Sequence, residues 1–225
     1  MNSSGFNVYP GGKGANQAAA AAKLGYQTFF VGQVGKDAYA PMLKGALSEC
    51  GVNTTLVSTV NGSWENSIIL VGGANKSDEW QITDEATQIA MSARVPVVLD
   101  AGGGMDPIGA DLLANISILS PNETELSRLT GMPTRTMAQV QAAAESLIHS
   151  GVNKVLVKLG SKGCLLVDIY GNVIRQKAFP VLNVVDTTGA GDCFTAAFAV
   201  AMLEGKSDAE AMAFASTWQM HWFCI

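Results

Sequence analysis

The chain has 225 residues, of which 48% are hydrophobic and 15% are charged, so it is long enough for one soluble α/β domain with a sizeable core. Its net charge of −5 gives no reason to expect nucleic acid or a membrane as a partner, because both attract basic surfaces. The cysteines Cys50, Cys164, Cys193 and Cys224 lie far apart without C-x-x-C spacing, which argues against a disulfide framework or a zinc site and indicates a reducing compartment.

No targeting or membrane segment is visible in the sequence. Residues 1–14 have neither the basic region nor the apolar region of a secretory signal. The longest apolar stretch, around residues 194–203, is too short to cross a bilayer. We therefore expect a cytoplasmic protein, with an organelle such as the plastid as the alternative if a presequence is missing from this chain.

Apolar periodicity and the positions of glycine and proline predict alternating helices and strands. The pattern first predicts a helix over 14–25, a strand over 27–35, a helix over 37–51 and strands over 52–60 and 65–73. A helix over 83–93, strands over 95–100 and 116–120, and helices over 122–131 and 136–150 follow. The last part is predicted to form strands over 153–160, 164–170, 172–179 and 181–185, and then helices over 194–203 and 207–217. Gly25 should end the first helix, and Asp37 should cap the second.

This alternation predicts an α/β fold, a mainly parallel sheet with helices on both faces. We find no internal repeat or low-complexity linker and expect one domain over residues 1–225. Glycine-rich loops at 102–104, 160–163 and 189–191 each follow a predicted strand. They should gather at the edge of the sheet formed by the carboxyl ends of the strands, where such folds bind ligands.

The loop between the last predicted strand and the helix over 194–203 reads Asp-Thr-Thr-Gly-Ala-Gly-Asp, residues 186–192. A loop of this kind directs several backbone N–H groups into one small space at the positive end of a helix dipole, which suits an anion such as phosphate. The alternative is an ordinary helix start, with Asp192 as the cap and the glycines forming the turn.

A second glycine-rich segment, Gly-Gly-Lys-Gly-Ala-Asn-Gln at residues 11–17, stands at the start of the first predicted helix. Its glycines would let a ligand approach the backbone, and Lys13 and Asn16 offer hydrogen bonds to hydroxyl groups. The alternative is a glycine-rich turn with a solvated lysine. The segment is not a Walker A loop, nor a dinucleotide fingerprint, since Gln17 stands where the third glycine should be.

Two further segments each allow a structural and a functional interpretation. In residues 120–125, Ser-Pro-Asn-Glu-Thr-Glu, Asn122 can cap a helix with Glu125 as the third residue of a capping box, or the pair can lie beside Mg²⁺ or a phosphate. Residues 158–163, Lys-Leu-Gly-Ser-Lys-Gly, follow a strand and form either a β-hairpin turn or a loop able to wrap a nucleotide.

Taken together, the four segments resemble the ribokinase family of carbohydrate kinases. Residues 11–25 look like its N-terminal signature, residues 186–199 look like its more specific C-terminal signature, and the other two segments lie between them in the family's order. The resemblance implies a three-layer fold with a mainly parallel central sheet and a small β lid, which is reduced here. It also implies phosphoryl transfer from MgATP to the 5-hydroxyl of D-ribose. The alternatives are a kinase for another sugar or nucleoside, and a non-catalytic truncated variant.

The resemblance also assigns roles to individual residues. It implies that Asp192 is the catalytic base and that Gly189, Ala190 and Gly191 form an anion hole for the transferred phosphoryl group. The remaining implied positions are Gly12, Lys13 and Asn16 together with Asp192 for the sugar, Asn122, Lys158, Leu159, Gly160, Ser161, Lys162 and Gly163 for the nucleotide, Glu125 for the Mg²⁺ network, and Asp186 and Thr188 for an activating K⁺.

Parts of the family pattern have no counterpart in this chain. Residues 1–10 leave no room for the family's first strands, only a short turn stands between Val60 and Glu65 where the lid continues, and no strand and helix fit between Gln88 and Val95. We find no family counterpart for residues 218–225, and no metal role for His221. We therefore expect weak or absent kinase activity, and we regard homodimerisation through the reduced lid as doubtful.

Overall fold

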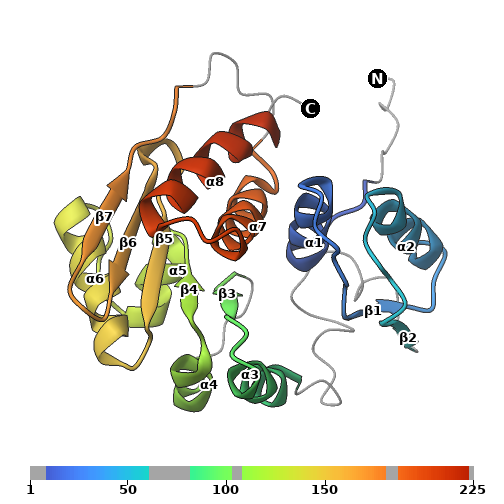
Figure 1. The fold of residues 1–225 in the computed structure, drawn as a ribbon, viewed down its shortest axis with the longest axis horizontal. Coiled ribbons are helices and arrows are strands. Elements are labelled where there is room, and N and C mark those ends of the chain that lie inside the picture. The colour runs from blue at the N-terminus through green and yellow to red at the C-terminus, as the bar shows by residue number, and fades with distance from the viewer. Residues whose placement is uncertain (1–8, 61–81, 103–107, 181–186, 223–225) are drawn as a thin grey trace, which may run out of the picture. The chain divides into compact units, whose positions relative to one another are not determined.

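The computed structural model describes residues 9–60, 82–102, 108–180 and 187–222 (Figure 1). Backbone contacts divide the chain into two compact units, residues 1–77 and 78–225. The single domain expected from the sequence stays a prediction. The strands predicted over 65–73 and 181–185 lie outside the described residues.

The first unit contains two helices and a pair of parallel strands. Its elements are α1 (Lys13–Lys23), β1 (Gly32–Gly35), α2 (Ala40–Glu49) and β2 (Val57–Val60). The helices pack through small and aliphatic side chains, with Ala18, Leu47 and Val52 buried between them. Gly25 follows α1 at φ +89°, a conformation that glycine adopts without strain, and so ends the helix as predicted.

Two predictions for this unit need correction. The strands predicted over 27–35 and 52–60 form a ladder only over Gly32–Gly35 and Val57–Val60, with an isolated bridge between Phe29 and Asn53 before it. Helix α2 begins at Ala40, later than predicted, and Asp37 is not its cap residue. Instead, Asp37 Oδ1 accepts the N–H groups of Tyr39 at 2.8 Å and Ala40 at 3.0 Å, and so stabilises the turn that leads into the helix.

The second unit is built on a five-stranded sheet of order β3-β4-β5-β6-β7. The first three strands are parallel and the last two are added antiparallel, so the predicted α/β class with a mainly parallel sheet is confirmed. The elements are α3 (Ile82–Ser92), β3 (Val98–Asp100), α4 (Ala110–Asn115), β4 (Ile118–Ser120), α5 (Glu123–Thr130), α6 (Met137–His149), β5 (Lys154–Lys158), the 3₁₀ turn Gly160–Lys162, β6 (Cys164–Asp168), β7 (Val173–Gln176), α7 (Ala190–Leu203) and α8 (Asp208–Trp222).

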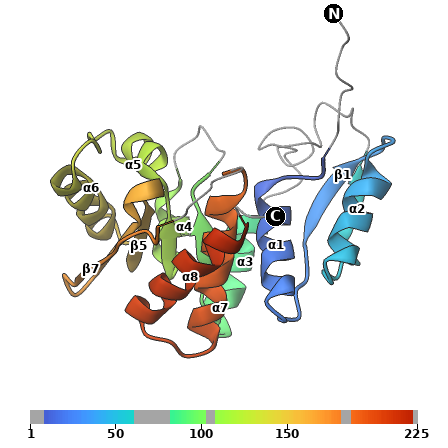
Figure 2. The same cartoon turned by 90° about the horizontal axis from the view of Figure 1, so that it is seen from above.

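Helices cover both faces of this sheet and make three layers. Helices α5 and α6 pack on one face, and α7 and α8 pack on the other (Figure 2). Strand β6 is buried at every position, which is typical of a strand covered from both sides. Helix α7 is buried around most of its circumference, which explains its nearly unbroken apolar sequence.

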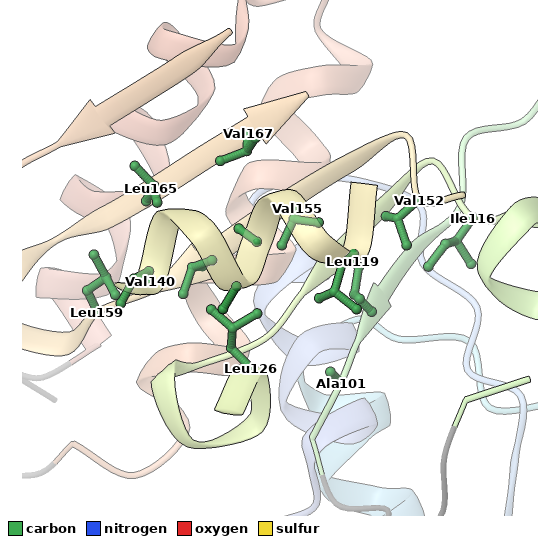
Figure 3. Close-up of a cluster of buried hydrophobic side chains, with 14 residues drawn as sticks. Ala101, Ile116, Leu119, Leu126, Val140, Val152, Val155, Leu159, Leu165 and Val167 are labelled. Atoms are coloured by element: carbon green, nitrogen blue, oxygen red, sulfur yellow. The ribbon is translucent and has the colours of Figure 1, made fainter. Parts of the chain in front are cut away.

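The main core of the unit fills the space between the sheet and helices α5 and α6 (Figure 3). Leu119 and Leu165 from the strands meet Leu126 of α5 and Val140 of α6, and all four side chains are at most 1% exposed. Full burial of one such side chain stabilises the fold by about 1.5–3 kcal/mol. This core therefore holds the strand ends and the start of α5 in fixed positions.

Helix boundaries in this unit differ from prediction at three places. Helix α4 was not predicted, α7 begins at Ala190 rather than Phe194, and α8 continues through Trp222 instead of ending at Thr217. Residues 82–102 pass from α3 to β3 without a further strand, as predicted. Within the described residues we find no helix with the length and hydropathy needed to cross a membrane.

Candidate functional site

The parallel strands β3, β4 and β5 end at one edge of the sheet and bring polar residues together there. Asp100, the last residue of β3, pairs in register with Ser120, the last residue of β4. Lys158 ends β5 and bridges to Asn122, with its N–H donating to Pro121 O at 2.9 Å. Because ligands of open α/β sheets bind beyond the carboxyl ends of the strands, this edge is the candidate site.

Helix α5 begins at this edge with a complete capping box. Asn122 Oδ1 accepts the N–H of Glu125 at 2.8 Å, and Glu125 Oε2 accepts the N–H of Asn122 at 2.8 Å. Glu125 is only 8% exposed, so its carboxylate is held at the helix start. The structural interpretation of this segment is confirmed, while a role for Glu125 beside Mg²⁺ and for Asn122 on a nucleotide stays a prediction.

Helix α7 begins with the glycine-rich loop and places Asp192 in its first turn. Gly189 is the N-cap residue, in the left-handed conformation at φ +76°, and its carbonyl accepts the first helical N–H, that of Cys193, at 2.9 Å. The interpretation of Asp192 as the helix cap is therefore wrong. Asp192 is the third residue of the helix and is 6% exposed.

The first N–H groups of a helix have no acceptor within the helix, so the start of α7 has the geometry to bind an anion. The Ala190 N–H donates to Thr187 O at 3.2 Å and would have to be released before it could bind one. A Cβ added at Gly191 would lie 3.8 Å from the Lys158 side chain, an ordinary van der Waals contact, so the lysine stem lies beside this first turn. The predicted anion hole at residues 189–191 stays a prediction.

A buried polar network connects the strand ends to α7. Lys158 Nζ lies 2.6 Å from Asp100 Oδ2, and the two side chains are 11% and 7% exposed. Thr195 Oγ1 accepts from Lys158 Nζ at 3.2 Å and lies 3.1 Å from Asp100 Oδ2. Ser120 Oγ is 3.4 Å from the same threonine oxygen. The network thus joins β3, β4 and β5 to the second turn of α7.

Sequence reasoning did not select Asp100 or Thr195 as site residues. A signal for Asp100 was available, since an acidic residue ends an apolar strand immediately before a glycine-rich loop. Thr195 lies inside an apolar helix, and no pattern in the surrounding sequence distinguishes it as a site residue.

The segment after β5 forms the connection of an antiparallel hairpin to β6, so the hairpin interpretation is confirmed. Leu159 is 2% exposed and its side chain belongs to the core, which leaves only its backbone for a ligand. Lys162 Nζ pairs with Glu123 Oε1 at 2.9 Å and ties the turn to the start of α5. Gly160 and Ser161 are exposed, and a nucleotide contact by this segment stays a prediction.

Three of the predicted sugar residues lie at the start of α1 in the first unit, whereas the fourth, Asp192, and the predicted nucleotide residues belong to the second unit. Gly12 is the N-cap at φ +113°, Lys13 is the first helical residue, and the Asn16 N–H donates to Gly12 O at 2.8 Å. All three are half-buried. Their role in binding a sugar stays a prediction.

Within the described residues, no group of three or more His, Cys, Asp or Glu side chains could hold a metal ion alone. Mg²⁺ in kinase sites is held by one or two carboxylates together with substrate phosphates and water. The buried carboxylate of Glu125, at the start of α5, fits this donor set. Of the predicted K⁺ ligands, Thr188 is exposed just before α7, and Asp186 lies outside the described residues.

Comparison with known proteins gives consistent matches. The pfkB family of carbohydrate kinases matches residues 1–78 and 64–218. A ribokinase of Arabidopsis thaliana is 46% identical over 92% of this chain and 65% of its own length. A deoxyribokinase of Salmonella typhi is 33% identical over 86% of this chain and 74% of its own.

The fold comparison agrees with the sequence comparison. The structure of Arabidopsis thaliana ribokinase complexed with ribose and ATP superimposes with a TM-score of 0.87 at 45% identity. It covers 96% of this chain and 81% of that one. The predicted three-layer fold of the ribokinase type is therefore confirmed.

Proposed function

Because the chain belongs to the pfkB family of carbohydrate kinases, we propose that it transfers the γ-phosphoryl group of MgATP to the 5-hydroxyl of D-ribose. Ribose and ATP are the ligands of the Arabidopsis ribokinase structure that it resembles. The chain spans 65% of the length of that plant's curated ribokinase, so activity and substrate are proposed here for this chain.

One observation carries the proposal, the first turn of α7. There a left-handed glycine starts the helix and a buried carboxylate, Asp192, stands two residues inside it. In phosphoryl transfer the protein mainly positions the reactants and stabilises charge, because it takes little part in the covalent chemistry itself. A helix start with a fixed carboxylate provides an anion site and a proton acceptor within one turn.

In the proposed reaction, Asp192 accepts the proton of the attacking 5-hydroxyl. The backbone N–H groups at residues 189–191 stabilise the charge on the phosphoryl oxygens, and removing one such donor from a comparable site costs about 10²–10³ in rate. Lys158, at the end of β5, neutralises charge on the nucleotide phosphates. Glu125 would hold Mg²⁺ through water, and the bound ion would supply further charge neutralisation for the phosphates.

We further propose that Asp186 and Thr188 contribute oxygen ligands to an activating K⁺. Carboxylate and hydroxyl oxygens suit such a hard cation. The likeness between Asp-Thr-Thr at 186–188 and the family signature supports the proposal. Replacing K⁺ by tetramethylammonium, which is too large for such a site, should lower turnover at constant ionic strength.

The direct test is ADP release by the purified chain with MgATP, K⁺ and ribose. We expect slow, ribose-dependent turnover, and Asp192→Asn should lower it by about 10²–10⁴-fold because the variant cannot accept the proton. Asp208→Asn is a matched control, since it removes a carboxylate at the start of α8 that pairs with Lys154. A folded chain that binds ATP but shows no turnover above the Asp192→Asn level would refute the proposal and favour the non-catalytic alternative.

A second candidate substrate is 2-deoxyribose, favoured by the likeness to the Salmonella typhi deoxyribokinase. A site built to hydrogen-bond a substrate hydroxyl rejects an analogue that lacks it by about 10⁴–10⁵-fold. Parallel measurement of kcat/KM for ribose and 2-deoxyribose therefore separates the two. Equal values would mean that the 2-hydroxyl is not recognised.

A further inference from the structure

Asp100, the partner of Lys158 in a buried ion pair, is a charged residue of the candidate site that the proposed reaction leaves without a role. The two charged atoms are 2.6 Å apart, and both side chains are almost withdrawn from water. A buried ion pair adds little net stability compared with an apolar pair, because desolvating both charges offsets their attraction. Its presence at the candidate site therefore calls for a reason other than stability.

The pair fixes the lysine against the first turn of α7. A Cβ placed on Gly191 would lie 3.8 Å from Lys158 Cδ and 4.0 Å from Cε, so the lysine stem runs along that turn. Thr195, one turn further along the same helix, lies 3.0 Å from the Gly191 carbonyl and accepts from the lysine ammonium. Lys158 is thus held from two sides, by Asp100 from β3 and by Thr195 from α7.

Among the described residues, this arrangement leaves one N–H group of the Lys158 ammonium for a ligand. A lysine ammonium has three N–H groups. Within the described part of the chain, Asp100 and Thr195 are the acceptors recorded for Lys158 Nζ. The third N–H remains beside a helix start whose own N–H groups attract anions.

We propose that Asp100, together with Thr195, is a positioning residue that fixes the Lys158 ammonium beside the start of α7 for contact with the nucleotide triphosphate. The inference rests on the proposed function, because it assumes that a nucleotide binds at this edge. Asp100 acts through Lys158 and not on the substrate directly. Its effect must therefore depend on the presence of phosphates on the ligand and on the lysine side chain.

The test compares binding of MgATP and of adenosine by isothermal titration calorimetry. Asp100→Asn keeps the shape of the side chain but removes its charge. The MgATP dissociation constant of this variant should rise about tenfold, which corresponds to the loss of one hydrogen bond to a charged group. The adenosine constant should change less than about twofold, since adenosine has no phosphate. Thr195→Val should act in the same direction, and it carries the test if Asp100→Asn does not fold.

Two controls separate positioning from general destabilisation. Asp208→Asn breaks an ion pair of 2.7 Å at the opposite end of the same strand, with Lys154, and should leave the ratio of the two dissociation constants unchanged. In a Lys158→Met background, Asp100→Asn should have no further effect on MgATP, because the group it positions is gone.

Three results would overturn the inference: an equal loss of affinity for both ligands, unchanged or tighter MgATP binding in Asp100→Asn, or a full Asp100→Asn effect in the Lys158→Met background. A wild-type chain that binds neither ligand would refute the proposed function and the inference together. If the wild-type chain binds MgATP and Asp100→Asn leaves the ratio of the MgATP and adenosine dissociation constants unchanged, the inference alone is refuted.

Discussion

Replacing Gly163 with alanine should destabilise the second unit strongly, because both the backbone conformation and the available space require glycine. Gly163 has φ +96°, which costs an alanine about 1–2 kcal/mol. A Cβ there would lie 2.0 Å from Gln176 O and 2.6 Å from Ala178 N. These are backbone atoms, which cannot turn away as a flexible side chain would, so relieving the overlap costs about 1–3 kcal/mol more.

We therefore expect Gly163→Ala to lower the free energy of unfolding by about 2–5 kcal/mol, a large part of the about 5–15 kcal/mol that holds a typical domain. Urea unfolding followed by circular dichroism measures this directly. Gly160→Ala is the matched control in the same turn, since Gly160 has φ +56° but no atom within 4 Å of an added Cβ. If Gly163→Ala cost no more than Gly160→Ala, the argument from steric overlap would be wrong.

Three further predictions follow from local contacts. Asn122→Ala should lower the free energy of unfolding by about 1 kcal/mol through loss of a capping box, and it should also weaken MgATP binding. Thr136→Ala, at the capping box of α6, should lower stability in urea unfolding but leave MgATP binding unchanged in calorimetry. Burial alone would raise the pKa of Asp168, but hydrogen bonds from the Asn172 side chain and from backbone N–H groups outweigh it and hold that pKa below its usual value. The ionised Asp168 therefore stabilises the fold above the unfolded pKa of about 4, and this stabilisation is lost as the pH falls through the folded pKa. In Asp168→Asn, the free energy of unfolding should fall less steeply with decreasing pH below about pH 4. An unchanged slope of unfolding free energy against pH would contradict this. Burial raises the pKa of the Cys164 thiol to about 12, so a thiol reagent at pH 8 should label this cysteine only when the chain unfolds. Mass spectrometry detects the label, and rapid labelling of Cys164 in the native chain would contradict the prediction.

Features set by neighbouring residues could be predicted from the sequence. The start and end of α5 follow from Asn122, Glu125 and Gly131, which lie within ten residues and form the expected capping box and left-handed C-cap. The alternation of strands and helices in the second unit was predictable for the same reason, since the periodicity of each segment is local.

Features set by distant residues could not be predicted. Thr195 and Asp100 are 95 positions apart, and only the return of α7 to β3 brings them together. The start of α7 was misplaced because Gly189 and not Asp192 is the cap, a choice that depends on backbone conformation rather than residue preference. Helix α4 was missed because it is six residues long and buries no residue, so it leaves no clear apolar pattern.

The order of strands in the sheet of the second unit follows the order of the chain, from β3 to β7. Each strand therefore pairs with its predecessor, and loop closure between such neighbours is fast because little chain entropy is lost. Helix α7 has to return across the whole sheet to reach β3, so we expect it to dock last. A nucleotide that recognises the finished arrangement should then slow unfolding without accelerating folding. A newly synthesised chain would thus complete the scaffold of its ligand site well before that site could bind anything.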